Sequence, residues 1–318
     1  FFFKQKTAYE IKECDWSSDV CSSDLYTIEA RVDPNLQMLT AKVKLQFTPD
    51  ADASEMTLGF HQSMELHTVT TESGDTVPVQ RVADSNIRLQ FSQPFPKGKS
   101  ASITFDYAGK ITGNEESPVW GIKFAAIHDD NAYFMYPSRW FPVNDYTVDR
   151  FAMDLKVTVP TGYTIAASGI AAASTEANGL KTQEFEFTQA SFPGSFAVMK
   201  GDPQSARSNA LDATFLFRSG TKMTSAYGEE FSKAMDYFTG LYGLPPSRRL
   251  AIVEIGPAQQ IAGIADPLVP RIFVKEQAQL LLRLRIELRF PQAEAIGVFV
   301  LAGIVGGGLG DRLDRRET

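Results

Sequence analysis

Ser138-Arg-Trp-Phe-Pro-Val-Asn-Asp145 leads into Arg150-Phe-Ala-Met-Asp-Leu-Lys-Val-Thr-Val-Pro160, and Ala167-Ser-Gly169 follows shortly after it. An aromatic–Pro turn thus precedes a segment in which apolar and polar residues alternate. This alternation has the period of a half-buried β-strand. The strand ends on a Pro-Thr-Gly turn, and the neighbouring segments repeat the same style. The stretch therefore predicts a fold built from short strands.

Alternating segments separated by turn residues continue through most of the chain. They cover residues 26–32, 39–47, 56–60, 87–91, 102–107, 151–159 and 182–187. Turn clusters such as Ser73-Gly-Asp and Pro96-Lys-Gly separate them. Many short strands at this spacing are typical of an antiparallel β-sandwich or saddle.

The period changes near Asp202. Apolar residues then recur at helical spacing on one face of a segment that Gly243 and Pro245-Pro246 end: Tyr227, Phe231, Ala234, Met235, Phe238 and Leu241. An apolar run over residues 249–255 indicates a buried strand. The fold class expected is mostly β: an antiparallel sandwich or saddle over residues 26–204, then an incomplete α+β domain over 205–284.

The order and spacing of these motifs resemble the N-terminal β-domain of zinc aminopeptidases of the aminopeptidase N family. That domain carries R-x-F-P-C-F-D-E-P, a strand, a V-P-x-G turn and a short A-x-S-N-G. Four residues match in register (Arg139, Phe141, Pro142 and Asp145), and four depart (Val143, Asn144, Tyr146 and Thr147). Residues 205–284 resemble the opening of the family's thermolysin-like catalytic domain. The resemblance implies a metallopeptidase acting on peptide substrates.

Composition excludes several other classes of protein. The net charge of −7 and the absence of clustered Lys and Arg argue against a nucleic-acid surface. Both cysteines lie within the first 25 residues, so the remainder holds no disulfide, thiol nucleophile or cysteine metal site. Such a sequence is compatible with either redox compartment and leaves the localisation open, an extracytoplasmic one included.

Both ends differ in composition from the middle. Residues 1–25 have no helical or strand period, and their tail resembles the conceptual translation of a sequencing adapter, so we interpret them as foreign to the fold and disordered. The alternative is a flexible leader in which Cys14 and Cys21 pair.

Residues 285–318 are interpreted as a foreign or frameshifted tail. Within it, residues 295–310 are uncharged and apolar, and the closing Gly-x-Leu-x-Asp-Arg pattern resembles a loop of major-facilitator transporters. If this tail is genuine, it predicts contact with a membrane. The alternative is a buried Gly-rich helix.

The resemblance implies a zinc site made by two His of an H-E-x-x-H helix and a downstream Glu, with the Glu of the motif activating a water. The chain has three histidines, His61, His67 and His128, and none lies in such a motif. Ile286-Glu-Leu-Arg-Phe290 falls in the expected place but has no His. We therefore predict no metal ligands and no catalytic residues in this chain, and surface or turn positions for the histidines.

The family's G-A-M-E-N segment, which holds the free amino group of the substrate, is replaced by Gly263-Ile-Ala-Asp-Pro267. Gly263, Ala265 and Asp266 are therefore the substrate-binding candidates, since a carboxylate can pair with an ammonium group. The alternative is a simple turn, because Gly, Asp and Pro are common in turns. The Gln that the family's β-domain adds to this site has no clear counterpart before Arg139.

Two hypotheses follow. The chain is the N-terminal fragment of a metallopeptidase-like protein, with peptide substrates and zinc expected for an intact member. Alternatively, it is a non-catalytic β-rich binding or scaffold module with a degenerate peptidase domain.

Overall fold

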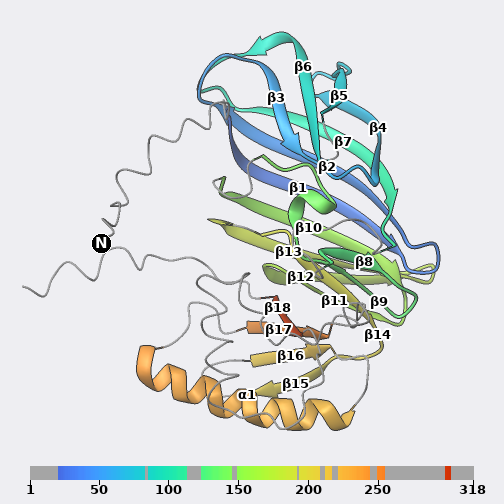
Figure 1. The fold of residues 1–318 in the computed structure, drawn as a ribbon, viewed down its shortest axis with the longest axis vertical. Coiled ribbons are helices and arrows are strands. Elements are labelled where there is room, and N and C mark those ends of the chain that lie inside the picture. The colour runs from blue at the N-terminus through green and yellow to red at the C-terminus, as the bar shows by residue number, and fades with distance from the viewer. Residues whose placement is uncertain are drawn as a thin grey trace, which may run out of the picture.

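The computed structural model describes residues 21–82, 85–112, 123–144, 149–191, 193–207, 212–216, 221–243, 249–254 and 298–301. Strands dominate this part of the chain, as the alternating sequence predicts. They form a large curved sheet, two smaller sheets against it, and a separate sheet covered by a helix (Figure 1).

Seven strands make the large sheet, in the order β12-β13-β10-β1-β2-β7-β4. Their bounds are β1 Cys21–Asp33, β2 Met38–Pro49, β4 Met64–Thr71, β7 Ala101–Lys110, β10 Phe151–Pro160, β12 Ile170–Ala177 and β13 Leu180–Ser191. Neighbouring strands are antiparallel except β1 and β10, which are parallel and pair Leu25 with Ala152. This parallel pair joins the first part of the β-domain to the part that follows the aromatic turn.

Two smaller sheets bury the inner face of the large one. The first has the order β3-β6-β5, with β3 Ala53–Gly59, β5 Val79–Val82 and β6 Asn86–Phe95. The second has the order β11-β14-β9-β8, with β8 Ala125–Ile127, β9 Asn131–Phe134, β11 Tyr163–Ala167 and β14 Phe196–Lys200. All three sheets contribute to one apolar core, for example through Val43, Leu58 and Phe134, each fully buried.

A four-stranded sheet with the order β15-β16-β17-β18 follows the β-domain. Its elements are β15 Gln204–Arg207, β16 Asp212–Leu216, α1 Thr221–Tyr242, β17 Arg249–Glu254 and β18 Val298–Leu301. Alternate residues of β16 face opposite ways, so Phe215 packs on Phe231 of α1 while Leu216 packs on the β8–β9–β14 sheet. The sheet therefore lies between helix α1 and the β-domain (Figure 1).

The strands expected from alternation are present. The change to helical spacing expected near Asp202 comes later, because strands β15 and β16 follow Asp202 before helix α1 begins at Thr221. The mostly β fold class is confirmed. One member of the predicted apolar helix face differs: Leu241 is 56% exposed, whereas Ala234, Met235 and Phe238 are buried. Leu241 lies in the last turn of α1, next to the exposed Tyr242, and no described strand covers it there.

The ends also differ from expectation where the structure describes them. Strand β1 begins at Cys21 rather than Tyr26, because pairing with β2 continues past a bulge between Ser23 and Leu25 as far as Cys21 and Pro49. Within the apolar tail, β18 pairs antiparallel with β17. In the described residues, helices long and apolar enough to cross a membrane are absent. Cys14 lies outside the described residues.

A buried carboxylate just before β10 binds the start of strand β1. Both Asp149 oxygens accept the backbone N–H of Ser23, at 3.2 and 3.1 Å. Burial raises the pKa of Asp149 above its ordinary value, although hydrogen bonds from Ser23 and Asn144 act in the opposite direction. The charged form is therefore less favoured in the folded than in the unfolded protein.

The raised pKa of Asp149 predicts a pH dependence of stability. Its contribution is fully present below the unfolded pKa of about 3.9 and is lost as pH rises through the higher folded pKa. We expect Asp149→Asn to remove this loss, because the amide stays neutral and its oxygen still accepts the Ser23 N–H. Relative to the wild type, the variant should gain unfolding free energy as pH rises from about 3.5 to 7, measured by urea unfolding at several pH values.

Asp154→Asn is the matched control, because Asp154 is an exposed residue of strand β10, which begins two residues after Asp149. A gap between wild type and Asp149→Asn that stays constant over this pH range, or that widens equally in the control, contradicts the prediction.

Candidate functional site

The aromatic–Pro turn lies where the three sheets of the β-domain meet. It begins in the 3-10 helix η2 (Pro137–Arg139), and Trp140 and Phe141 are fully buried. The indole Nε1–H of Trp140 donates to the Gly194 carbonyl at 2.8 Å, and the Trp140 carbonyl accepts the Tyr107 hydroxyl at 2.6 Å. Trp140 is therefore a core residue of the β-domain.

The backbone of the aromatic–Pro turn is also hydrogen-bonded to strand β3 of the β3-β6-β5 sheet and to the loop that follows β3. Gly59 and Val143 exchange two hydrogen bonds, at 2.8 and 3.0 Å, and the His61 N–H donates to the Ser138 carbonyl at 2.9 Å. A Cβ at Gly59 would lie 3.2 Å from the Cβ of Ser138, so the two segments approach closely. These contacts fix the position of Arg139 relative to the loop that carries His61.

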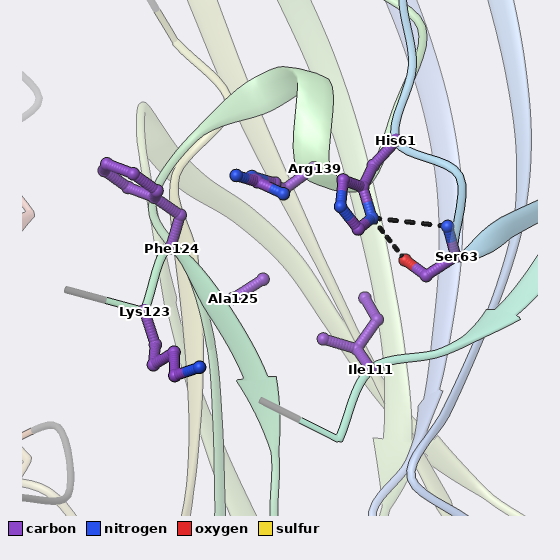
Figure 2. Close-up of a pocket in the computed structure, with 7 residues that line it drawn as sticks. All are labelled: His61, Ser63, Ile111, Lys123, Phe124, Ala125 and Arg139. Atoms are coloured by element: carbon purple, nitrogen blue, oxygen red, sulfur yellow. Dashed lines mark hydrogen bonds between the residues drawn. The ribbon is translucent and has the colours of Figure 1, made fainter. Parts of the chain in front are cut away.

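A pocket opens beside this turn (Figure 2). Its described lining residues are His61, Ser63, Ile111, Lys123, Phe124, Ala125 and Arg139. The residues come from three places: the β3–β4 turn, the connection between β7 and β8, and η2. Three of the side chains are basic or can become so, and none of the seven is acidic.

A second feature is a buried amide on the face of the β-domain toward the second sheet. Asn131 opens β9 and pairs with Met199 of β14. Met199 and Tyr133 pack against Leu216 and Val253 of the second sheet. Because side chains alternate along a strand, Asn131 lies on this same face.

Asn131 is 1% exposed, and within the described part of the chain neither its amide oxygen nor its amide nitrogen has a hydrogen-bond partner. A buried polar group without partners costs about 1–3 kcal/mol. The amide offers a donor and an acceptor together, which is the pattern that a peptide group complements. Sequence analysis did not identify Asn131, because a single Asn at the start of a short strand carries no distinctive signal.

The three histidines lie apart. His61 is a buried turn residue whose Nδ1 is 2.7 Å from the Ser63 hydroxyl. His67 is half exposed on β4, with its Nδ1 3.5 Å from Asp106. His128 lies in the turn between β8 and β9. Among the described residues, no three His, Cys, Asp or Glu side chains gather in a way that could hold a metal ion, so these residues do not fit a zinc site.

The remaining sequence candidates lie outside the described residues. They are the substrate-binding candidates Gly263, Ala265 and Asp266, and the segment from Ile286 to Phe290.

Comparisons with known proteins give a match in structure but not in sequence. No protein-family model matches the chain, and neither does any curated protein. The M1 zinc metallopeptidase of Deinococcus radiodurans superposes with a TM-score of 0.61 at 19% identity, covering 75% of this chain and 57% of that one. A two-domain M1 zinc metallopeptidase mutant bound to L-arginine gives the same values. A D. radiodurans mutant bound to a Tyr-Ser-Ala substrate gives a TM-score of 0.58 at 19% identity, covering 74% and 57%.

At this level of identity the likeness establishes the fold. The chain has the fold of an aminopeptidase N-like N-terminal domain, as its aromatic–Pro turn and strand pattern predict. It spans little more than half the length of the matched metallopeptidase chains.

Proposed function

We propose that this chain is the N-terminal part of a metallopeptidase-like protein that acts on the N-termini of peptides, and that this part does not itself hold the zinc ion. The observation that carries the proposal is the shared fold, which extends over 75% of the chain in structures of M1 zinc metallopeptidases. Two of these relatives were solved with L-arginine or a Tyr-Ser-Ala substrate bound. Peptides are therefore the substrate class proposed for the whole protein.

In this proposal the β-domain covers one side of a peptide-binding cleft. Asp266 is proposed to pair with the free amino group, with Gly263 and Ala265 beside it. The described residues of this chain do not form a set of metal ligands.

The metal prediction is tested directly. We expect the purified protein, after removal of any tag, to hold well below one zinc ion per chain and to hydrolyse no aminoacyl-anilide substrate. The reason is that the two His ligands of an H-E-x-x-H helix must lie on one helical face, and the spacing of His61, His67 and His128 does not provide such a pair. Metal analysis and an anilide assay in zinc-supplemented buffer provide the measurement.

The control set is His61→Ala, His67→Ala and His128→Ala, which report whether any residual zinc depends on a histidine. Zinc near one equivalent together with hydrolysis would overturn the proposal that this part lacks the metal site. The sequence after Leu284 in an intact reading frame separates the two functional hypotheses: H-E-x-x-H with a downstream Glu supports the peptidase, and its absence supports a scaffold module.

A further inference from the structure

We propose that Asn178 and Gly179 form a modification site, at which the asparagine amide converts spontaneously through a succinimide to aspartate and isoaspartate. The two residues make the turn between β12 and β13, and β12 is the outermost described strand at one end of the large sheet (Figure 1). Asn178 is the only asparagine of the chain that a glycine follows. The proposal does not depend on the peptidase function.

The turn is a tight one in which both residues adopt a positive φ. Ala177 pairs with Leu180, so Asn178 and Gly179 are the two residues between the paired strands. Their φ values are +53° and +75°. A type I′ hairpin turn requires a positive φ at both central positions, and Asn-Gly is the sequence that such turns prefer. The geometry of the hairpin therefore places a glycine directly after this asparagine.

Both residues are accessible to solvent. Asn178 and Gly179 are exposed, and a Cβ built on Gly179 would meet no described atom within 4 Å. The Gly179 carbonyl accepts the Thr161 N–H at 2.9 Å, but the Gly179 nitrogen takes no part in that bond. Water can therefore reach the side-chain amide and the glycine nitrogen together.

The reaction needs only these two residues and water. The Gly179 nitrogen loses its proton to hydroxide and attacks the side-chain carbonyl carbon of Asn178. A new C–N bond closes the succinimide ring, while the side-chain nitrogen takes a proton from water and leaves as ammonia. Water then opens the ring at either carbonyl, which gives aspartate or isoaspartate without oxidation or reduction. Because glycine has no Cβ, its side chain does not hinder the attack.

Isoaspartate weakens the hairpin, because it adds one carbon to the backbone of a two-residue turn whose length fixes the strand register. Strand β12 depends on this hairpin. All eight of its residues are exposed, so its side chains do not anchor it in the core. We expect the pairs next to the turn, Ala177 with Leu180 and Glu176 with Lys181, to be lost first.

Incubating the purified full-length protein in mildly alkaline buffer at physiological temperature tests the modification. Peptide mapping by mass spectrometry, with enzymatic methylation of isoaspartate as a second readout, measures the conversion of each asparagine. Asn35 and Asn86 are the matched controls, because both are exposed but precede Leu36 and Ile87, whose side chains hinder the attack. We expect several-fold more conversion at Asn178 than at either control, and less conversion in mildly acidic buffer, where fewer amide nitrogens lose their proton.

Hydrogen exchange of the backbone amides tests the consequence for the hairpin. The isoaspartate form, separated by chromatography, should exchange the amides of β12 several-fold faster than the unmodified protein, while the buried strand β2 stays protected. Freshly purified Asn178→Asp is the matched variant, because it carries the added charge on an unaltered backbone. It should keep the protection of the unmodified protein.

Conversion at Asn178 that is no faster than at Asn35 and Asn86 overturns the modification site. Equal protection of β12 in the isoaspartate form and in Asn178→Asp overturns the weakening of the hairpin by the added backbone carbon. These measurements do not bear on the zinc content or the anilide assay, so this proposal and the proposed function fail separately.

Discussion

Replacing Trp140 with Ala lowers the free energy of unfolding by about 3–5 kcal/mol, the usual cost of removing a buried aromatic side chain. The indole is fully buried and packs edge-on against Phe141 and Phe196, at centroid distances of 4.6 and 4.9 Å. Its removal leaves a cavity where three sheets meet, and it leaves the Gly194 carbonyl without its donor. A typical domain is stable by about 5–15 kcal/mol, so this single change removes a large part of the total.

Trp140→Phe separates the contribution of aromatic packing from that of the hydrogen bond to the Gly194 carbonyl. Phenylalanine keeps an aromatic ring at the junction but cannot donate to Gly194, so we expect a smaller loss of about 1–3 kcal/mol. Urea unfolding followed by far-UV circular dichroism measures both variants. A Trp140→Ala protein that unfolds at the wild-type urea concentration would show that the turn does not hold the sheets together.

Gly169→Ala is expected to cost about 2–5 kcal/mol, from backbone strain and steric overlap together. Gly169 closes the Ala167-Ser-Gly169 motif between β11 and β12, and its φ of +102° lies in the region that favours glycine. A Cβ built there lies 2.5 Å from the Glu186 carbonyl oxygen, on the backbone of β13, which cannot move without breaking its pairing.

Gly162→Ala is the matched control. Gly162 has a similar φ of +88°, but a Cβ there meets nothing within 4 Å. Its substitution should cost only the conformational part, about 1–2 kcal/mol. Chemical unfolding of the two variants side by side measures the steric part as their difference, and equal losses would contradict the close approach of Gly169 to β13.

Half of the described strands of the β-domain, seven of fourteen, could be predicted from the sequence because they depend on local periodicity. The alternation in residues 39–47 becomes strand β2, with buried residues at every second position. The sequence did not predict strands β4, β5, β8, β9, β11, β12 and β14. Among these, β8, β9 and β14 are buried runs of three to five residues, which carry no alternation. Their sheet is recognisable only once its strands are paired.

The absence of an H-E-x-x-H histidine pair is likewise a property of the sequence alone, since two ligands on one helical face must be four residues apart. The start of β1, by contrast, depends on a contact between residues far apart in the sequence. Residues 21–25 have no period of their own, yet Ser23 is buried because Asp149, 126 residues away, accepts its N–H. No local pattern contains that contact.

The sequence by itself determined the strand-rich fold, the aromatic–Pro turn and the lack of a histidine ligand pair, because each depends on residues close together in the chain. Only the tertiary structure decided that Asn131 is buried without a partner on the face toward the second sheet. It also decided that His61, Lys123 and Arg139 line one pocket. These three residues lie in separate segments, and they come together only because the register of the sheets and the packing of Trp140 set the distances between those segments.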